Sequence, residues 1–437
     1  MYTENIIAIA KRENNTKRKF LVVNKEQGKH VPVSPDRPLR MFSALADLTA
    51  ERYKGERLLL IGFAETATAI GEALAVLLDA DYMQTTREHI PDVDYLYFSE
   101  SHSHAAQQKV VKNDLDLVID RIDRIVFVED EVTTGNTIGK IVRLIRLTYG
   151  RKLNFSAVSL LNGMDEEARE RYRKEQIELA YLVKTDHSGY SEKAEKYKGD
   201  GEYHECMAAE REKIPVLGGV NAEKIEELKV LGYINARRLH RGREYQSACQ
   251  ALWQTLRDKI PFGKDRDILV LGTEEFMYAP LYVAERIREM GNRVKFHATT
   301  RSPIMVSGEP EYPLHERYEL ASFYDRKRAT YVYDLDVYDL ALIITDAERE
   351  ELPAECNLNL EREELPAECN LSLEGEELPA ECNLSLEREE LSVKCNLGEA
   401  EENVPIKRGL GAGAASLCSA LCSRGNGEIY LVRWCKD

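Results

Sequence analysis

The sequence predicts an α/β protein in which a parallel sheet is covered by helices on both faces. A second, smaller α/β domain that carries a low-complexity insertion is expected to follow. Three observations lead to this expectation. Short apolar runs alternate with amphipathic runs through about the first half of the chain, as in buried parallel strands joined by helices. The alternation resumes near residue 267, and a thirteen-residue repeat then interrupts it.

The first domain contains two especially apolar runs, at 57–63 and 124–129, and each precedes an amphipathic run. These are the expected central strands, because strands buried on both faces are continuously apolar. In chain order we expect strands at 20–23, 57–63, 82–85, 95–98, 124–129, 155–161 and 177–183, and helices at 38–53, 66–78 and 137–149.

The second domain is predicted by the same signals. The pattern from 222 to 257 is helical and suggests a connecting element. In the second domain we expect strands at 267–271, 294–297, 340–344 and 428–432, and a helix at 279–290. The expected division is therefore 1–215 for the first domain, 216–262 for a helical connector and 263–437 for the second domain, with the insertion at about 347–425.

The insertion repeats the string Glu-Glu-Leu-Pro-Ala-Glu-Cys-Asn-Leu from Glu350, Glu363 and Glu376, with a degenerate copy from Glu389. Each unit has few apolar groups, and a proline in the first three blocks a continuous helix, so we expect a solvated segment. Residues 347–402 carry a net charge of −14 out of −16 for the chain. The acidity therefore belongs to this segment and not to a ligand site. Its evenly spaced single cysteines lack the paired spacing of structural zinc, so no protein zinc site is predicted.

The remaining composition excludes several classes of protein. No segment reaches the roughly 18 apolar residues of a membrane helix, and no basic stripe with interleaved aromatic residues suggests nucleic acid as the main ligand. The odd count of nine cysteines does not suggest a disulfide framework. We expect a cytoplasmic protein that forms a homo-oligomer and does not associate with membranes.

The strand at 124–129 leads into a group of residues with a distinct chemistry. Glu129 and Asp130 precede a Thr-Thr-Gly-Asn-Thr turn and a helix. Gly135 allows a tight turn, whose N–H groups would converge at a helix amino terminus that favours an anion. The two acids would bind vicinal sugar hydroxyls or hold Mg²⁺ through water. Acids that can bind a diol, next to backbone N–H groups that can bind a phosphate, indicate a binding site for a ribose 5-phosphate. The phosphate turn consists of Thr133, Thr134, Gly135, Asn136 and Thr137.

This string resembles the 5-phosphoribosyl-1-pyrophosphate (PRPP) motif of type I phosphoribosyltransferases. The resemblance implies the parallel sheet of that fold, PRPP as a substrate and Mg²⁺ as a cofactor. In such enzymes an earlier strand ends in a loop that binds pyrophosphate through backbone groups. The loop in the expected position consists of Ala64, Glu65, Thr66, Ala67 and Thr68.

Further motifs narrow the family. Thr-Thr-Arg-Glu at 85–88 and Thr-Thr-Arg-Ser-Pro at 299–303 accompany the PRPP string. Together they look like a bacterial two-domain family in which an orotate-phosphoribosyltransferase-like domain precedes a TRSP domain. The resemblance covers nearly the whole chain except the repeat. It implies a transferase that forms or phosphorolyses a nucleotide-like metabolite with an unknown base-like acceptor, in a stress or tellurium-resistance pathway. A PRPP-sensing regulatory or scaffold protein without turnover is the alternative.

Several candidate residues remain open at this stage. Hypoxanthine-type relatives have a carboxylate where Thr133 stands, so the general base must be another residue, such as Glu131 or Glu100, or absent. Lys29 and His30 would contact the substrate or lie in an exposed turn. The segment that type I enzymes use as a flexible hood would stabilise departing pyrophosphate. Its candidates are Arg87, Glu100, His102 and His104.

The second domain contains a strand, a glycine and a Glu-bearing turn at 269–275 that resemble those at 59–65. Because loops after parallel strands share one edge of a sheet, we expect a second pocket, separate from the PRPP site, for a polar and anionic molecule. In that case the second domain would be a separate catalyst that acts on the product of the first. The expected lining is Gly272, Thr273, Glu274, Arg301, Ser302 and Asp346.

Overall fold

A six-stranded sheet organises the first part of the computed structural model, which describes residues 2–13, 18–98, 108–150, 152–206, 224–348 and 410–436. Its strand order is β12-β4-β3-β7-β8-β9, and all neighbours are parallel except β12, which pairs antiparallel with β4. The expected parallel sheet is therefore confirmed. The strands are β3 (Leu58–Gly62), β4 (Asp81–Gln84), β7 (Arg124–Val132), β8 (Asn154–Asn162), β9 (Ile177–Lys184) and β12 (His240–Arg241).

A second sheet of five parallel strands has the order β11-β18-β17-β13-β14. Its central strands β13 and β17 are almost completely buried, in agreement with their apolar sequences. The strands are β11 (Lys224–Val230), β13 (Asp267–Gly272), β14 (Arg293–Ala298), β17 (Leu340–Thr345) and β18 (Glu428–Trp434).

Smaller antiparallel units accompany the two sheets. The pairs are β1 (Ile7–Lys11) with β2 (Phe20–Asn24), β5 (Tyr95–Tyr97) with β6 (Lys109–Val111), and β15 (Glu316–Ala321) with β16 (Ala329–Tyr333). Strand β15 also pairs in parallel with β10 (Glu202–Glu205). The expected strand at 20–23 therefore exists but lies in a hairpin outside the main sheet.

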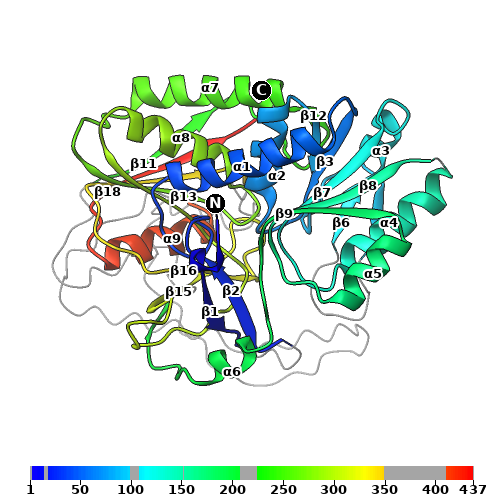
Figure 1. The fold of residues 1–437 in the computed structure, drawn as a ribbon. Coiled ribbons are helices and arrows are strands. Elements are labelled where there is room, and N and C mark those ends of the chain that lie inside the picture. Colours follow the sequence, from blue (N-terminus) through cyan, green and yellow to red (C-terminus); the bar gives the residue numbers. More distant parts are fainter. Residues whose placement is uncertain are drawn as a thin grey trace, which may run out of the picture. The chain divides into compact units, whose positions relative to one another are not determined.

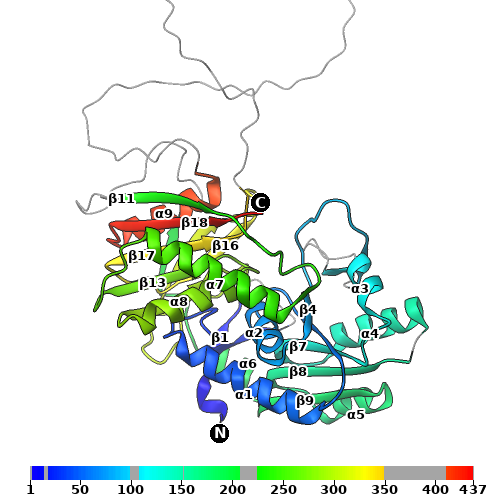
Figure 2. The same cartoon turned by 90° about the horizontal axis from the view of Figure 1, so that it is seen from above.

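Four helices, α1 (Asp36–Arg52), α2 (Thr68–Leu78), α7 (Gly242–Lys259) and α8 (Tyr278–Glu289), lie side by side (Figures 1 and 2). Helix α1 packs on β8 and β9, α2 packs on β3 and β7, and α8 packs on β13 and β14. Because α2 also contacts α7 and α8, one apolar core joins the two sheets. Helices α4 (Asn136–Tyr149) and α5 (Glu166–Lys174) lie on the other side of the first sheet (Figure 1). The shorter helices and the last one are η1 (Glu4–Ile6), α3 (Lys112–Val118), α6 (Tyr190–Glu195) and α9 (Ala412–Ser423).

Three boundaries differ from the sequence-based expectation. The connector is not helical throughout, because residues 224–230 form strand β11, whose partner β18 lies 200 residues away and is invisible to local periodicity. The insertion does not extend to 425, because α9 is buried in the second core. Strand β7 does not end at Glu129 but continues through Asp130 and Glu131 to Val132, paired with β8. The repeats lie outside the described residues.

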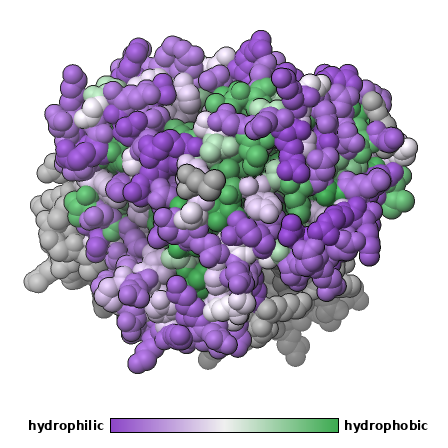
Figure 3. Space-filling view, viewed as in Figure 1, coloured by the Kyte–Doolittle hydropathy of each residue, from purple (hydrophilic) through white to green (hydrophobic). Residues whose placement is uncertain are grey.

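The surface seen in Figure 3 is mostly hydrophilic, and its hydrophobic side chains gather near the middle of this view. Partly buried apolar residues of α1, such as Leu39 and Leu48, pack against the core. None of the described helices has the length and apolar character needed to cross a bilayer.

Candidate active site

The two loops expected to bind phosphates lie next to each other. Strands β3 and β7 are hydrogen-bonded parallel neighbours, so the loops that follow them leave the same edge of the sheet. The loop after β3 leads into α2, and the loop after β7 leads into α4. Two helix amino termini therefore adjoin one edge, where their dipoles favour anions. A hydrogen bond between Thr66 and Asp130 links the two loops.

The two acids of the PRPP string are partly buried at the end of β7. Burial raises the pKa of Glu129 well above its usual value, and the negative charges of Asp130 and Glu131 raise it further. Burial also raises the pKa of Asp130, although the hydrogen bond from Thr66 opposes this effect. Among the described residues, neither acid has an ion-pair partner. A pair of acids without matching cations is suited to sugar hydroxyls or a bound cation.

The phosphate turn has the geometry that its sequence suggests. Gly135 has a φ of 68°, and a Cβ at this position would collide with the ring of Tyr172. The Tyr172 hydroxyl donates to the carbonyl of Gly135 at 2.9 Å, and Arg171 donates to the carbonyl of Thr134 at 2.6 Å. These contacts from α5 turn the carbonyls away and hold the turn in place, so its N–H groups remain for a ligand.

Glu131 differs from its two neighbours because it has cationic partners. Its carboxylate lies 2.6 Å from Nη2 of Arg18 and 3.1 Å from Nε2 of His187. Burial raises the pKa of Glu131, but His187 and Arg18 outweigh this effect and lower it. A carboxylate with a lowered pKa is a weak base, so the candidacy of Glu131 as general base loses support. Sequence reasoning missed Arg18 and His187, which come from distant segments without a motif.

Three side chains from other segments form hydrogen bonds with the backbone of the loop after β3. Thr85 Oγ1 accepts from the N–H of Ala64 at 2.8 Å, and Gln108 donates to the carbonyl of Ala64 at 2.9 Å. Gln27 donates to the carbonyl of Thr66 at 2.7 Å. Ala67 and Thr68 then lead into α2. This fixed loop presents its remaining backbone groups beside Asp130.

Lys29 and His30 are both buried, so the expectation of an exposed turn is wrong. Lys29 Nζ lies 2.6 Å from Glu65 and donates to the carbonyls of Glu274 and Thr299, each at 2.8 Å. All three of its N–H groups are used, so Lys29 positions Glu65 and has none left for a substrate. His30 differs, because its Nε2 is buried without a hydrogen-bond partner, and burial lowers its pKa to about 3.

The second-domain residues meet at one edge as expected, because β17, β13 and β14 are parallel neighbours. Thr273 Oγ1 lies 2.9 Å from Thr345 Oγ1, and Arg301 Nε donates to Glu274 at 2.6 Å. Asp346 accepts a hydrogen bond from the Tyr233 hydroxyl at 2.5 Å. The remaining lining residues, Gly272 and Ser302, belong to the same loops, after β13 and β14.

The expected separation of this pocket from the PRPP site is wrong. The backbone N–H of Arg301 donates to the Glu65 carboxylate at 3.2–3.3 Å, and its guanidinium also contacts Glu88 of the first domain. Burial raises the pKa of Glu65, but Lys29 and Arg301 outweigh it and lower the pKa to about 2. The two domains therefore share one charged network at the pyrophosphate loop. Local sequence could not show this, because the partners are 236 residues apart.

Arg87 is the member of the expected hood that the structure describes, and it lies against this network. Its backbone N–H donates to Glu275 at 3.1 Å, while its Nε is buried without a hydrogen-bond partner. Burial lowers the pKa of Arg87, and the positive charge of Arg301 adds to this effect. Glu100, His102 and His104 lie outside the described residues.

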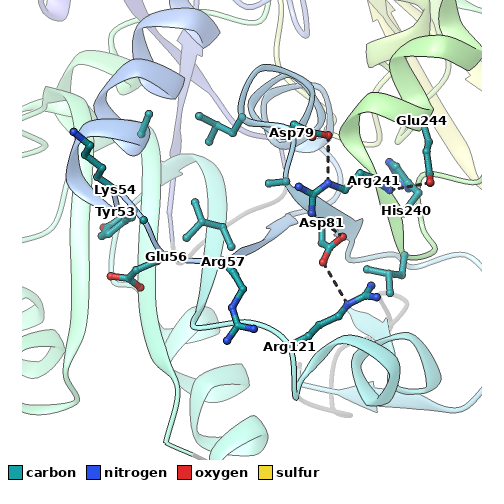
Figure 4. Close-up of a pocket in the computed structure, with 16 residues that line it drawn as sticks. Tyr53, Lys54, Glu56, Arg57, Asp79, Asp81, Arg121, His240, Arg241 and Glu244 are labelled. Carbon is teal, nitrogen blue, oxygen red and sulfur yellow. Dashed lines mark hydrogen bonds and ion pairs between the residues drawn. The ribbon is translucent and has the colours of Figure 1, made fainter.

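A cavity of about 830 Å³ opens at the opposite end of the first sheet (Figure 4). Several of its charged side chains are already paired: Arg241 contacts Asp79 at 3.2 Å, and Arg121 contacts Asp81 at 3.6 Å. Residues at the amino ends of β3 and β4 form part of the wall. Because ligands of open α/β sheets bind at the carboxyl ends of the strands, the edge with the two loops is the better candidate site.

Family models of known proteins match two regions of the chain. Residues 6–188 match a family described as phosphoribosyl transferase, and residues 237–359 match one described as the TRSP domain C-terminal to it. No curated protein matches the chain.

Solved structures that resemble the chain include two adenine phosphoribosyltransferases. The one from Rhodothermus marinus has 16% identity and a TM-score of 0.31, and the match covers 42% of this chain and 96% of the other. The one from Giardia lamblia, complexed with 9-deazaadenine, has 13% identity, the same coverage and a TM-score of 0.32. Orotate phosphoribosyltransferase from Aeropyrum pernix has 15% identity and a TM-score of 0.29, covering 45% and 96%.

Sheet, loops and family match define a glycosyltransferase of the pentosyltransferase class, which uses PRPP. Residues 6–188 therefore belong to this phosphoribosyltransferase family, and the TRSP domain that follows it occupies residues 237–359.

Proposed function

We propose that the protein transfers the 5-phosphoribosyl group of PRPP to a base or base-like small molecule and thereby forms a nucleotide-like metabolite. The observation that carries this proposal is the pairing of β3 with β7, which brings two helix-amino-terminal loops together with Glu129 and Asp130 between them. A diol site between two phosphate sites matches the chemical layout of PRPP. A role in a stress or tellurium-resistance pathway belongs to this proposal and rests on the family resemblance alone.

In the proposed reaction, the acceptor forms a bond to the anomeric carbon of PRPP while the bond to pyrophosphate breaks and its electron pair leaves with pyrophosphate. Glu129 and Asp130 would hold the ribose hydroxyls, and the turn at 133–137 would bind the 5-phosphate. The loop at 64–68 would bind the departing pyrophosphate through backbone groups. The protein would act mainly by positioning and by stabilising charge. Because the reverse reaction uses the same site, breakdown of the nucleotide is equally compatible.

The acids at the end of β7 also fit Mg²⁺. Three consecutive carboxylates, two of them with raised pKa values and without cationic partners among the described residues, form a donor set that a hard cation would stabilise. Glu129 and Asp130 are the residues that would hold it. When bound, Mg²⁺ supplies positive charge beside the pyrophosphate.

A direct assay tests this proposal. The protein is incubated with PRPP, Mg²⁺ and a panel of purine, pyrimidine and related bases, and pyrophosphate release is followed. Base-dependent release is expected for at least one acceptor, and Asp130→Asn should slow it when PRPP is not saturating. PRPP binding without turnover on any acceptor would instead support the alternative of a PRPP sensor. That alternative is consistent with Thr133, which provides no carboxylate for proton exchange.

A further inference from the structure

The two sheets repeat one arrangement of elements. The order β4-β3-β7-β8-β9 in the first corresponds to β14-β13-β17-β18-β11 in the second. The connections also agree, because α2 joins β3 to β4 as α8 joins β13 to β14, and α4 precedes β8 as α9 precedes β18. An antiparallel pair follows β4 and another follows β14. Strand β11 differs, since it precedes the rest of its sheet in the chain.

The correspondence extends to individual hydrogen bonds. After β3 and β4, the N–H of Ala64 donates to Thr85 Oγ1 at 2.8 Å. After β13 and β14, the N–H of Glu274 donates to Thr299 Oγ1 at 3.0 Å. Each of these threonines begins a Thr-Thr-Arg turn, at 85–87 and 299–301.

The two units exchange contacts across their boundary. The carboxylate of Glu65 accepts from the N–H of Arg301, and the carboxylate of Glu275, which occupies the corresponding place in the second unit, accepts from the N–H of Arg87. Thr86 Oγ1 also donates to Glu275 at 2.7 Å. Since α2 and α8 also pack together, the units face each other as two copies would across a twofold axis.

Among the described residues, the second unit lacks the unpaired acids that are the candidate ribose contacts of the first. The register of β17 on β13 matches that of β7 on β3 and places Asp346 where the first copy has Asp130. Asp346 accepts from the hydroxyls of Tyr233 and Tyr324 and pairs with Arg237. The acidic repeats lie in the chain between β17 and α9, where the first copy has its phosphate turn.

What the second unit brings to the first is two guanidinium groups, those of Arg301 and Arg328, together with the carboxylates of Glu274 and Glu275 that pair with them. Arg301 and Arg328 both contact Oε1 of Glu88, in the case of Arg328 at 2.8 Å. The Nη1 of Arg301 and the Nε atoms of Arg328 and Arg87 are buried without hydrogen-bond partners. Buried guanidinium N–H groups left without partners are costly, and three of them in one network point to an anionic ligand.

We propose that the second domain is a degenerate copy of the transferase core that binds no PRPP itself and completes the pyrophosphate subsite of the first domain with Arg301 and Arg328. This inference rests on the proposed function, since PRPP provides the anion. Guanidinium groups bind phosphate oxygens through paired N–H groups. Glu274 and Glu275 are fully buried and hold the arginines in place. Glu88, at the partly exposed end of the network, is the carboxylate that a pyrophosphate oxygen replaces.

Calorimetry on the full chain can measure binding at the two ends of PRPP separately, with inorganic pyrophosphate and ribose 5-phosphate as the probes. Arg328→Gln is expected to weaken binding of inorganic pyrophosphate with Mg²⁺ by about 10- to 100-fold, the range for charge-assisted hydrogen bonds, and to leave ribose 5-phosphate affinity unchanged. Glu88→Gln is expected to strengthen pyrophosphate binding. The exposed neighbour Arg326 provides the matched control, because Arg326→Gln should alter neither affinity. Arg328→Lys keeps the positive charge but loses the paired N–H groups of the guanidinium. It is used in place of Arg328→Gln if that variant does not fold.

The outcomes also separate this inference from the proposed function. A wild-type chain that binds neither probe overturns both. A wild-type chain that binds both probes, with full pyrophosphate affinity in Arg328→Gln, overturns the inference alone. An equal loss for both probes also overturns it, because it would indicate a structural role for Arg328. PRPP should bind once per chain, and two equivalents would show that the second copy is not degenerate.

Discussion

Two acids occupy corresponding positions at the ends of β7 and β17, and their surroundings are opposite. Asp130 has no ion-pair partner among the described residues, and burial raises its pKa. Asp346 accepts hydrogen bonds from Tyr233 and Tyr324 and pairs with Arg237. The acid at the end of β7 therefore has no cationic partner among the described residues, whereas the acid at the end of β17 is neutralised by Arg237.

This difference separates a residue kept for a ligand from one that stabilises the fold. A buried acid without a cation lowers stability, and such costs concentrate where a ligand will provide the missing charge. A buried acid with a matched guanidinium stabilises the protein only while both partners are present. Removing Asp346 should therefore lower the stability of the fold, whereas removing Asp130 should weaken ligand binding.

The largest expected effect belongs to the paired acid. Asp346→Ala leaves Arg237 buried with Glu275 as its remaining carboxylate partner, and should lower the free energy of unfolding by about 3–5 kcal/mol. Urea denaturation measures this loss. Calorimetry at a temperature where the variant is folded should still find one PRPP site. A loss below about 1 kcal/mol would contradict the structural role of Asp346.

The unpaired acid should show the reverse pattern. Asp130→Asn is expected to weaken PRPP·Mg²⁺ binding by about 1.5–3 kcal/mol, the scale of a charge-assisted hydrogen bond, with no loss of thermal stability. Calorimetry and a thermal melt measure the two effects. Asp92→Asn, on an exposed loop, provides the control. Unchanged PRPP affinity in Asp130→Asn would falsify the ribose contact.

The raised pKa values of the first copy predict a dependence on pH. Because the pKa values of Glu129 and Asp130 lie above their usual range, the free protein retains protons at a pH where an isolated carboxyl has lost them. PRPP·Mg²⁺ favours the carboxylates, so binding should release protons and tighten as pH rises, by up to about 1.4 kcal/mol per pH unit for one linked proton. Calorimetry in buffers of different ionisation enthalpy measures the release, and proton uptake on binding would contradict this prediction.

The smallest effect is expected from the insertion that separates β17 from α9. Replacing residues 350–401 with a short Gly-Ser linker should change the free energy of unfolding by under about 0.5 kcal/mol and the melting temperature by a few degrees, because the repeats offer few groups to bury. PRPP affinity should also be retained. Loss of soluble protein on deletion would show that the repeats pack against the second domain.

Strong local patterns predicted most elements of the fold. The runs at 57–63, 124–129 and 267–271 became β3, β7 and β13, because strands buried on both faces need continuous apolar sequence. The sequence of strand β11, Lys-Ile-Glu-Glu-Leu-Lys-Val, predicts a helix instead, because it has residues of high helix propensity. Its pairing with β18 overrides that propensity, as tertiary contacts often do in strands.

Local sequence is enough to identify the PRPP string, the loop at 64–68 and the likeness between 59–65 and 269–275, because strand, turn and helix amino terminus follow one another within a few residues. How these pieces act together follows only from the packing of the two sheets. The three N–H groups of Lys29 are taken by Glu65 and by the carbonyls of Glu274 and Thr299, and the N–H of Arg301 donates to Glu65 of the loop at 64–68. These contacts join residues that lie far apart in the chain. A turn is specified by its own residues, whereas an ion pair between residues 65 and 301 depends on how two sheets pack around α2 and α8.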